Sequence, residues 1–321
     1  MSSTIAIFLA QDGIINGAIY ALLGVTLFYR IARMLLAPNP DVQKMLKDHT
    51  GTHIAVIFDA GRYTFRNRLY EAYKAHRPPA PEELIPQFAL VREATEAFGV
   101  PAIELPDWEA DDLIAAYAKA MVDTGGTATI VSSDKDLMQL IRPGVAMQDP
   151  LKRRPIGLAE VMEKFGVPPE KVIEVQALIG DSTDNVPGVP GIGPKGASAL
   201  VNEFGDLEAV LAAAPGMKPS KRRDSLIEHA EKARISYQLV KLRDDAPLPL
   251  PIEALAAKEP DHDHLAGWLA AQGFRSTIAR LGLQAPAPAA TPDAPAPSAE
   301  PAAEKPPEPS VPFGPYQTVT T

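Results

Sequence analysis

Acidic side chains recur in this sequence where a strand is expected to end or a helix to begin. Asp59 follows the apolar run HIAVIF, and three later groups complete the set: Glu109, Asp111 and Asp112 in EADD, Asp134 and Asp136 in SSDKD, and Asp181 and Asp184 in GDSTDN. The carboxyl ends of parallel strands form the crevice in which an open α/β sheet binds its ligands. We therefore expect these carboxylates to converge in one place.

Such crowding requires counter-charge, because two carboxylates ~4 Å apart repel by about 4 kcal/mol at an effective dielectric constant of about 20. Glu109 and Asp112 are three residues apart, as are Asp181 and Asp184, so each pair is expected to share a helical face. Magnesium or manganese prefers oxygen ligands, and two such ions roughly 3.5–4 Å apart can stabilise both the attacking and the leaving oxygen of a phosphodiester. The acids therefore predict a site with two Mg²⁺ or Mn²⁺ ions that hydrolyses a nucleic-acid backbone.

A second interpretation is that each acid is only a helix N-cap, which is the commonest use of aspartate at such junctions. One isolated motif would favour the cap, whereas four in one chain favour the metal site. The two interpretations differ experimentally. Loss of a cap lowers stability, whereas loss of a ligand abolishes activity in a protein that still folds.

The glycine-rich segment NVPGVPGIGPKGASALVNEF is expected to bind phosphate without reading bases. Gly188, Gly191 and Gly193 allow the backbone to approach an anion, and Lys195 lies at the start of the helix that follows. The alternative is a tight connection between two helices.

Residues 62–78, RYTFRNRLYEAYKAHRP, combine cations that can contact phosphates with aromatic rings on which an unpaired base can stack. These side chains are expected near one helical face: Arg66, Tyr70, Tyr73, Lys74 and Arg77. The segment is therefore predicted to grip a single strand. The alternative is a solvated surface helix whose arginines extend into water.

The elements that must position these residues alternate between β and α. Residues 53–58 (HIAVIF) and 127–131 (TATIV) are short, apolar and rich in branched side chains, which is typical of buried parallel strands. Helical patterns follow at residues 84–98, 110–122, 158–165 and 169–179. This alternation predicts an α/β fold with a mainly parallel sheet flanked by helices, and residues 186–282 are expected to be helical.

Composition restricts the chemistry further. The chain has 321 residues, 46% of them hydrophobic, and no cysteine, so any metal must be a hard cation, and a reducing cytoplasm is the expected location. The net charge of −9 argues at first against a nucleic-acid partner. Without the net −3 of residues 285–321 and the eight carboxylates above, however, the remaining chain carries about +2. That remainder is compatible with DNA binding.

The first residues of the chain follow a different pattern. Residues 14–29 are uncharged and are followed by Arg30 and Arg33, but sixteen residues are fewer than the roughly 20 that span a bilayer. A marginal membrane segment and a buried helix are both compatible with this pattern, so membrane contact is expected only if residues 14–36 insert. Residues 1–36 resemble the start of a branched-chain amino-acid transporter permease.

From His53 to about Gly282 the chain resembles the 5′-nuclease (5′-3′ exonuclease) domain of bacterial DNA polymerase I, which is akin to flap endonucleases. The motifs that carry the resemblance are FDAGRYTFRN, YKAHRPPAPEELIPQF, EADDLIA, TIVSSDKDLMQL and GDSTDNVPGVPGIGPKGA. It implies two-metal catalysis by the eight acids, a helical arch around Arg66 to Arg77 and a helix–hairpin–helix at Val186 to Phe204, often with a potassium ion. The implied substrates are DNA with 5′ flaps, nicks or RNA primers. A monomer is expected, and no nucleotide cofactor.

The resemblance also defines the expected domains: an atypical N-terminal segment (1–52), an α/β nuclease core with the arch (53–185), a helix–hairpin–helix subdomain (186–284) and a flexible linker rich in proline and alanine (285–321). The family begins with a strand that ends in Asp-Gly at the centre of the metal site, and the first forty or so residues do not follow that pattern. The apolar run Ile5 to Ala10 followed by Asp12-Gly13 is a candidate for this strand and acid, although the permease resemblance explains the same letters. If the apolar run and Asp12 do not replace the missing strand and its acid, the expected protein is a DNA-binding remnant with impaired catalysis.

Overall fold

The computed structural model describes residues 4–9, 51–82, 84–150, 152 and 154–284, and all of them belong to one compact unit. A six-stranded sheet lies at its centre in the order β3-β2-β1-β4-β5-β6. Neighbouring strands are parallel from β3 to β5, and β6 is antiparallel to β5. The strands are β1 (Thr4–Leu9), β2 (His53–Ile57), β3 (Ala102–Ile103), β4 (Thr127–Val131), β5 (Val145–Gln148) and β6 (Pro155–Ile156).

Two strands form where the sequence predicts them, because their apolar branched residues fill both faces of the sheet. In β2, Ala55 and Ile57 are fully buried and Val56 is 8% exposed, and in β4, Ile130 is fully buried. A strand that is buried on both faces has a continuous apolar sequence rather than an alternating one. The predicted α/β class is confirmed.

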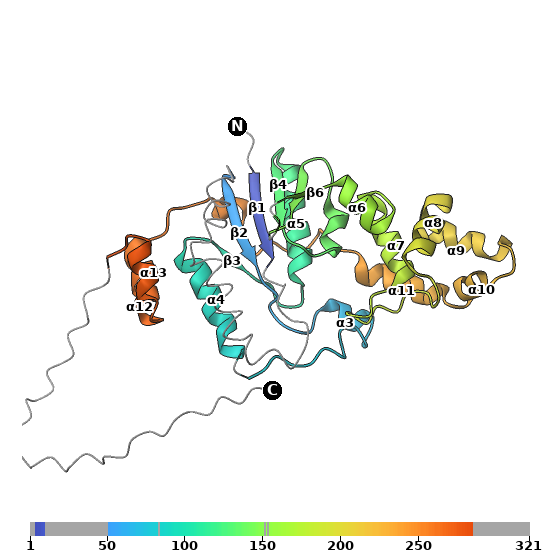
Figure 1. The fold of residues 1–321 in the computed structure, drawn as a ribbon, viewed down its shortest axis with the longest axis horizontal. Coiled ribbons are helices and arrows are strands. Elements are labelled where there is room, and N and C mark those ends of the chain that lie inside the picture. Colours follow the sequence, from blue (N-terminus) through green and yellow to red (C-terminus); the bar gives the residue numbers. More distant parts are fainter. Residues whose placement is uncertain (1–3, 10–50, 83, 151, 153, 285–321) are drawn as a thin grey trace, which may run out of the picture. The chain divides into compact units, whose positions relative to one another are not determined.

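Helices cover the sheet and continue beyond it (Figure 1). They are α3 (Phe65–Leu69), α4 (Ile85–Ala97), α5 (Ala110–Asp123), α6 (Leu158–Phe165), α7 (Val172–Ile179), α8 (Pro194–Phe204), α9 (Leu207–Ala213), α10 (Lys221–Glu228), α11 (Ala230–Val240), α12 (His262–Ala271) and α13 (Arg275–Arg280). Short 3-10 turns lie at η1 (Asp136–Leu140), η2 (Pro169–Lys171), η3 (Ala214–Gly216) and η4 (Ile252–Leu255).

Helix α5 is the central helix of the fold. It packs across β1, β2 and β4, and η4 lies against it as well. Its residues from Ala110 to Ala118 are all buried, which requires neighbours on more than one face. The acidic residues at its N-terminus are therefore held at one end of a rigid element.

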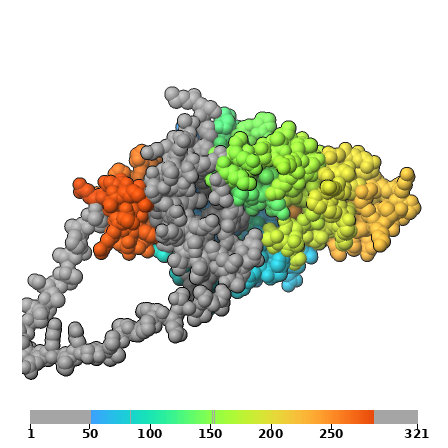
Figure 2. Space-filling view, in the orientation of Figure 1, coloured from blue at the N-terminus to red at the C-terminus, as the bar shows by residue number. Residues whose placement is uncertain are grey.

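The hydrophobic core is continuous across the expected boundary at residues 185 and 186. One cluster of buried side chains extends from Ala55 through Ala115 and Val175 to Leu211 and Leu255. Helix α7 packs against both α8 and α11, and Figure 2 shows the yellow region of α8 and α9 in continuous contact with the green central part of the chain. The helices that follow residue 186 are therefore packed directly onto the part of the chain that carries the acids.

The N-terminus contains a strand of the sheet. Strand β1 pairs in parallel with β2 on one side and with β4 on the other, so the expectation that the run beginning at Ile5 imitates a strand is confirmed for Thr4–Leu9. Asp12, the segment 14–36 and the linker 285–321 lie outside the described residues. Within the described ranges, no helix has the length and apolar character needed to cross a bilayer.

Candidate active site

Five of the predicted acids line one small cavity of about 20 Å³: Glu109, Asp111, Asp136, Asp181 and Asp184. They come from three elements, namely the N-terminus of α5, the turn η1 and the loop after α7. We call this space the carboxylate cavity. Side chains separated by more than 70 residues therefore meet as predicted.

Asp59 and Asp134 lie beside this cavity and also hold the local backbone. Asp59 follows β2, and its Oδ1 accepts a 2.8 Å hydrogen bond from the backbone N–H of Ala110. Asp134 follows β4, and its Oδ1 accepts a 2.9 Å hydrogen bond from the N–H of Asp136. Neither residue is the N-cap of a helix, since Glu109 caps α5 and Lys135 precedes η1, but each carboxylate binds a backbone N–H while its charge acts on Asp111.

Asp111 has the least favourable environment for a negative charge among these acids. It is 7% exposed, and its Oδ1 has no hydrogen-bond partner among the residues that the structure describes. Burial, followed by the negative charges of Asp134, Asp59 and Glu109, raises the pKa of Asp111 well above its ordinary value. A buried acceptor among like charges is the arrangement that a bound cation would stabilise.

Asp136 shows the same effect more weakly. Burial and the charge of Asp134 raise the pKa of Asp136 to about 7, although Lys135 and a hydrogen bond from the Gln176 amide oppose the shift. No motif in the sequence indicates a role for Gln176. It lies on α7, and its burial beside a strand-end acid becomes visible only in the folded chain.

Three basic side chains neutralise part of the cluster. The Lys74 Nζ lies 3.0 Å from Glu109 Oε2 and 3.8 Å from Asp184 Oδ2, while Arg77 pairs with Asp184. Lys135 pairs with Asp181. Burial alone would raise the pKa of Glu109, but the positive charges of Lys74 and Arg66 lower it overall. Of these three cations, Lys135 was missed in the sequence, although its place between Asp134 and Asp136 offered a signal.

The loop that carries Asp181 and Asp184 is not helical, so the predicted shared helical face was wrong for this pair. Helix α7 ends at Ile179, and Gly180 has a φ of 73°. Asp181 Oδ1 then accepts hydrogen bonds from the N–H groups of Thr183 (2.7 Å) and Asp184 (3.4 Å), which closes a tight turn. Both acids still reach the carboxylate cavity, because the turn rather than a helix directs them there.

Glu109 and Asp112 do reach one point, because both pair with Arg66 Nη1, at 3.7 and 2.6 Å, but only Glu109 lines the carboxylate cavity. Glu109 is the extended N-cap of α5, and Asp112 lies one turn into the helix, where its side chain is fully buried. Both oxygens of Asp112 face the Arg66 guanidinium, at 2.6 and 2.8 Å. Asp112 does not line the carboxylate cavity.

Residues 62–78 do not form one long helix, and the expectation of a single helical face was wrong. Helix α3 ends at Leu69, and Tyr70 is extended with a φ of −149°. The chain then turns so that Lys74, at a φ of 54°, donates its backbone N–H to the Asp184 carbonyl at 2.9 Å. The Asn185 amide, also not anticipated from the sequence, donates to the Ala72 carbonyl at 2.6 Å. The chain after Leu69 therefore packs against the loop that contains Asp184 and Asn185 instead of continuing the helix.

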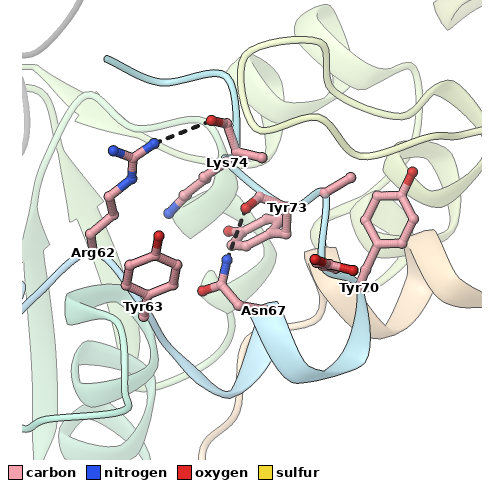
Figure 3. Close-up of a pocket in the computed structure, with 9 residues that line it drawn as sticks. Arg62, Tyr63, Asn67, Tyr70, Tyr73 and Lys74 are labelled. Carbon is pink, nitrogen blue, oxygen red and sulfur yellow. Dashed lines mark hydrogen bonds between the residues drawn. The ribbon is translucent and has the colours of Figure 1, made fainter. Parts of the chain in front are cut away.

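This segment surrounds a larger cavity of about 660 Å³, which we call the arch cavity (Figure 3). Tyr63 is 76% exposed beside it, and Tyr70, Lys74 and Arg62 also line it. The Arg62 guanidinium donates to the carbonyls of Ala75 (3.2 Å) and Arg77 (2.5 Å), which fixes it at the wall. Tyr73 lines both the arch cavity and the carboxylate cavity, so the two spaces adjoin.

Two residues predicted to contact DNA are buried instead. Arg66 is 1% exposed and Tyr73 is 4% exposed, and the Tyr73 hydroxyl donates to Glu109 Oε2 at 3.2 Å. Tyr70 is partly exposed, and Lys74 and Arg77 point toward the acids. The orientation of these side chains depends on the bend after α3, which their residue types do not indicate.

The glycine-rich segment divides into a buried and an exposed part. Gly188 is buried, and its N–H donates to Ser236 Oγ at 2.9 Å, so this amide is already occupied. Gly191, Gly193 and Lys195 are exposed, and a Cβ built on Gly191 or Gly193 meets nothing within 4 Å. The open backbone before α8 is therefore the part that an anion can approach.

The residues present fit divalent cations in their chemistry. Oxygen donors line the carboxylate cavity, Asp111 Oδ1 is buried with no partner in the described part of the chain, and no cysteine occurs in the sequence. Across the described ranges, no three acids or histidines come close enough together to form a complete metal-binding group. Asp12, the candidate for the remaining acid, lies outside those ranges.

Comparison with known proteins gives consistent results. Residues 33–166 match the 5′-3′ exonuclease N-terminal resolvase-like domain, and residues 167–263 match the 5′-3′ exonuclease C-terminal SAM fold. DNA polymerase I of Rhizobium leguminosarum is 52% identical over 232 residues, which cover 72% of this chain and 23% of that protein. The chain thus spans about a quarter of the length of this relative.

Solved structures share the fold. The bacteriophage T5 5′-exonuclease with bound zinc ions has a TM-score of 0.63 at 22% identity, covering 87% of this chain and 99% of its own. The T5 flap endonuclease in a pseudo-enzyme-product complex with DNA and metal ions has a TM-score of 0.59 at 22% identity, covering 86% and 96%. The two domain matches, which run without a gap from residue 33 to residue 263, show that this chain belongs to the 5′-3′ exonuclease family.

Proposed function

We propose that this chain hydrolyses DNA phosphodiester bonds as a structure-specific 5′-3′ exonuclease and flap endonuclease in replication and repair. One observation carries the proposal: the arch cavity, lined by tyrosines and cations, adjoins the carboxylate cavity through Tyr73. A single strand held in the first space would present its backbone to the acids of the second. The solved T5 flap endonuclease complex, which holds DNA and metal ions, supports this assignment.

Two divalent cations, Mg²⁺ or Mn²⁺, are the proposed cofactors. The acids that would hold them follow β2 and β4, begin α5 and η1, and lie in the loop after α7: Asp59, Glu109, Asp111, Asp134, Asp136, Asp181 and Asp184. When bound, such ions supply Lewis-acid activation of water and neutralise charge that develops at phosphorus. The relation to the zinc-bound T5 5′-exonuclease supports a divalent metal. Nucleotide cofactors are not part of this proposal.

The chain's own cations position the substrate. Lys74 lines the arch cavity, and its ammonium contacts Glu109 of the carboxylate cavity at 3.0 Å. A phosphate that enters between the two cavities would pair with Lys74 and Arg77, which would release these residues from the acids. Tyr63 and Tyr70 offer ring faces to an unpaired base, and such stacking contributes about 1–3 kcal/mol per base.

Duplex DNA is proposed to bind at the turn before α8. Helices α7 and α8 pack together across residues 180–193, an arrangement that fits a helix–hairpin–helix with a potassium ion at its turn. The exposed backbone at Gly191 and Gly193, followed by Lys195, would contact phosphates without reading sequence. Substrates with 5′ flaps, nicks or RNA primers, a monomeric state and a cytoplasmic location complete the proposal.

A catalytically impaired DNA-binding remnant is the second candidate, favoured by the observation that the described acids do not form a complete metal group. Incubation of the purified chain with a labelled 5′-flap duplex and Mg²⁺ tests both. Release of a short 5′ product is expected, with EDTA and the variant Asp134→Asn as negative controls. Binding of the flap without cleavage at any Mg²⁺ or Mn²⁺ concentration would establish the remnant instead.

A further inference from the structure

The buried pair of Arg66 and Asp112 joins the carboxylate cavity to distant parts of the chain. Asp112 Oδ2 accepts a 2.6 Å hydrogen bond from Arg66 Nη1, and Oδ1 accepts a 2.8 Å bond from Arg66 Nη2. The backbone N–H of Arg243 donates to Oδ1 at 2.9 Å, and the N–H of Glu109 donates to Oδ2 at 3.3 Å. Four donors therefore saturate this carboxylate.

Four of the five N–H groups of the Arg66 guanidinium are hydrogen-bonded as well. Besides the two bonds to Asp112, Arg66 Nε donates to the Leu239 carbonyl at 2.8 Å, and Nη2 donates to the Lys241 carbonyl at 3.2 Å. Both carbonyls lie at the C-terminal end of α11, which packs beside α3 (Figure 1). Burial tends to lower the pKa of Arg66, but the hydrogen bond with Asp112 and the charge of Glu109 raise it overall, so the guanidinium stays charged.

Three segments that are far apart in sequence meet at this pair: α3 below the arch cavity, the N-terminus of α5 and the end of α11. The α5 N-terminus carries Glu109 and Asp111, both of which line the carboxylate cavity. Asp112 is the residue that fixes it, because its carboxylate binds the Glu109 N–H directly. A shift of this helix end would displace two acids of the cavity together.

We infer that Arg66 and Asp112 are positioning residues for the metal-binding acids, and that Asp112 does not itself bind a metal. The inference rests on the proposed function, since it assigns to this pair the orientation of Glu109 and Asp111. Hydrogen-bonding partners behind a metal ligand typically change metal affinity or activity by about 10–100-fold when they are replaced. A lysine cannot replace Arg66, because an ammonium lacks the planar fork that reaches both oxygens.

The experiment measures Mn²⁺ binding to the DNA-free protein by electron paramagnetic resonance for Arg66→Lys and Asp112→Asn. Arg68→Lys is the matched control, since Arg68 lies on the same helix and makes a two-point pair with the exposed Asp107. We expect both site variants to bind the same number of ions as the unaltered protein but about 10–100-fold more weakly. Arg68→Lys should match the unaltered protein.

Two further measurements separate positioning from loss of fold. Duplex affinity in EDTA, by fluorescence anisotropy, should stay within about twofold, and flap cleavage should lose kcat at unchanged KM. Removing one member of a buried pair leaves the other charge uncompensated, so the double variant Arg66→Met with Asp112→Leu is made in parallel. This variant should fold and still bind Mn²⁺ weakly.

Several results would overturn the inference. Asp112→Asn with one Mn²⁺ fewer would make Asp112 a ligand, and unaltered Mn²⁺ affinity in the folded double variant would make the pair merely structural. If the unaltered protein bound no Mn²⁺, the proposed function would fail and this inference with it. If the unaltered protein bound Mn²⁺ and cleaved the flap while the variants did the same, only the inference would fail.

Discussion

At the scale of residues, the carboxylate cavity contains acids that are neutralised only in part. Lys74, Arg77 and Lys135 pair with Glu109, Asp184 and Asp181, while Asp111 Oδ1 has no hydrogen-bond partner within residues 4–9 and 51–284 as far as they are described. The unaltered fold therefore contains both an unsatisfied acceptor and cations that a metal would have to compete with. Substitution of Asp111 should therefore impair the metal site, whereas substitution of Lys135 should strengthen metal binding.

Asp111→Asn should lower the rate of flap cleavage at least about a hundredfold, while the protein remains folded. In the absence of metal this variant should also unfold at a higher temperature, because an amide removes the repulsion from Asp134, Asp59 and Glu109 that raises the pKa of Asp111. Differential scanning calorimetry in EDTA and a flap-cleavage assay measure the two effects. Asp123→Asn, on an exposed ion pair of the same helix, is the control. Full cleavage by Asp111→Asn would exclude this acid from the site.

Lys135→Gln should tighten Mn²⁺ binding several-fold, because the ammonium that pairs with Asp181 is removed and the cavity becomes more negative. Lys119→Gln, which breaks the exposed pair with Asp123, should leave the affinity unchanged. Isothermal titration with Mn²⁺ provides the comparison. Weaker binding by Lys135→Gln would show that this lysine orients Asp181 rather than competing with the metal.

At the scale of elements, two glycines allow the chain after α7 to fold back on itself. A Cβ on Gly188 would lie 2.5 Å from both the Gly180 N and the Ile179 carbonyl oxygen, and a Cβ on Gly180 would lie 2.5 Å from the Val186 carbonyl oxygen. This close approach closes the loop that presents Asp181 and Asp184. Gly191 has a positive φ of 80° as well, but it is surrounded by open space.

Gly188 and Gly191 provide a matched pair of substitutions. Gly191→Ala should destabilise the protein by about 1 kcal/mol through its left-handed backbone alone. Gly188→Ala adds overpacking against backbone atoms and should cost about 3 kcal/mol in total. Urea unfolding followed by circular dichroism measures both. Equal losses would mean that the loop yields to the added methyl group, and the close approach would then not be a constraint.

At the scale of the whole molecule, strand ends, helix starts and loops that are remote in sequence bring like charges into one folded cavity. The unfolded chain lacks this convergence, so the folded state binds divalent ions more tightly than the unfolded state. The net charge of −9 contributes repulsion across the whole chain, but it does not by itself place negative charges together in the cavity.

Addition of Mn²⁺ or Mg²⁺ should therefore raise the melting temperature of the unaltered protein. Saturation at about a hundred times the dissociation constant corresponds to a stabilisation of about 2.7 kcal/mol per site. Thermal unfolding in EDTA, in the divalent salt and in NaCl of equal ionic strength separates binding from screening. A shift that NaCl reproduces in full would contradict a specific metal site.

The sequence by itself was enough to predict the α/β class, the strands at residues 53–57 and 127–131, the helices that follow them and the acids that gather at their ends. Those features depend on local periodicity and on the geometry of parallel sheets, which are properties of short segments. The tertiary structure alone decided which side chains face the cavity. The bend after Leu69 is held against the loop after Gly180 by contacts between residues more than a hundred positions apart, such as Asn185 with Ala72. Asp112 likewise faces Arg66 rather than the cavity because a buried guanidinium, itself held by the end of α11, lies within hydrogen-bonding distance. No spacing between acidic residues encodes the position of such a partner.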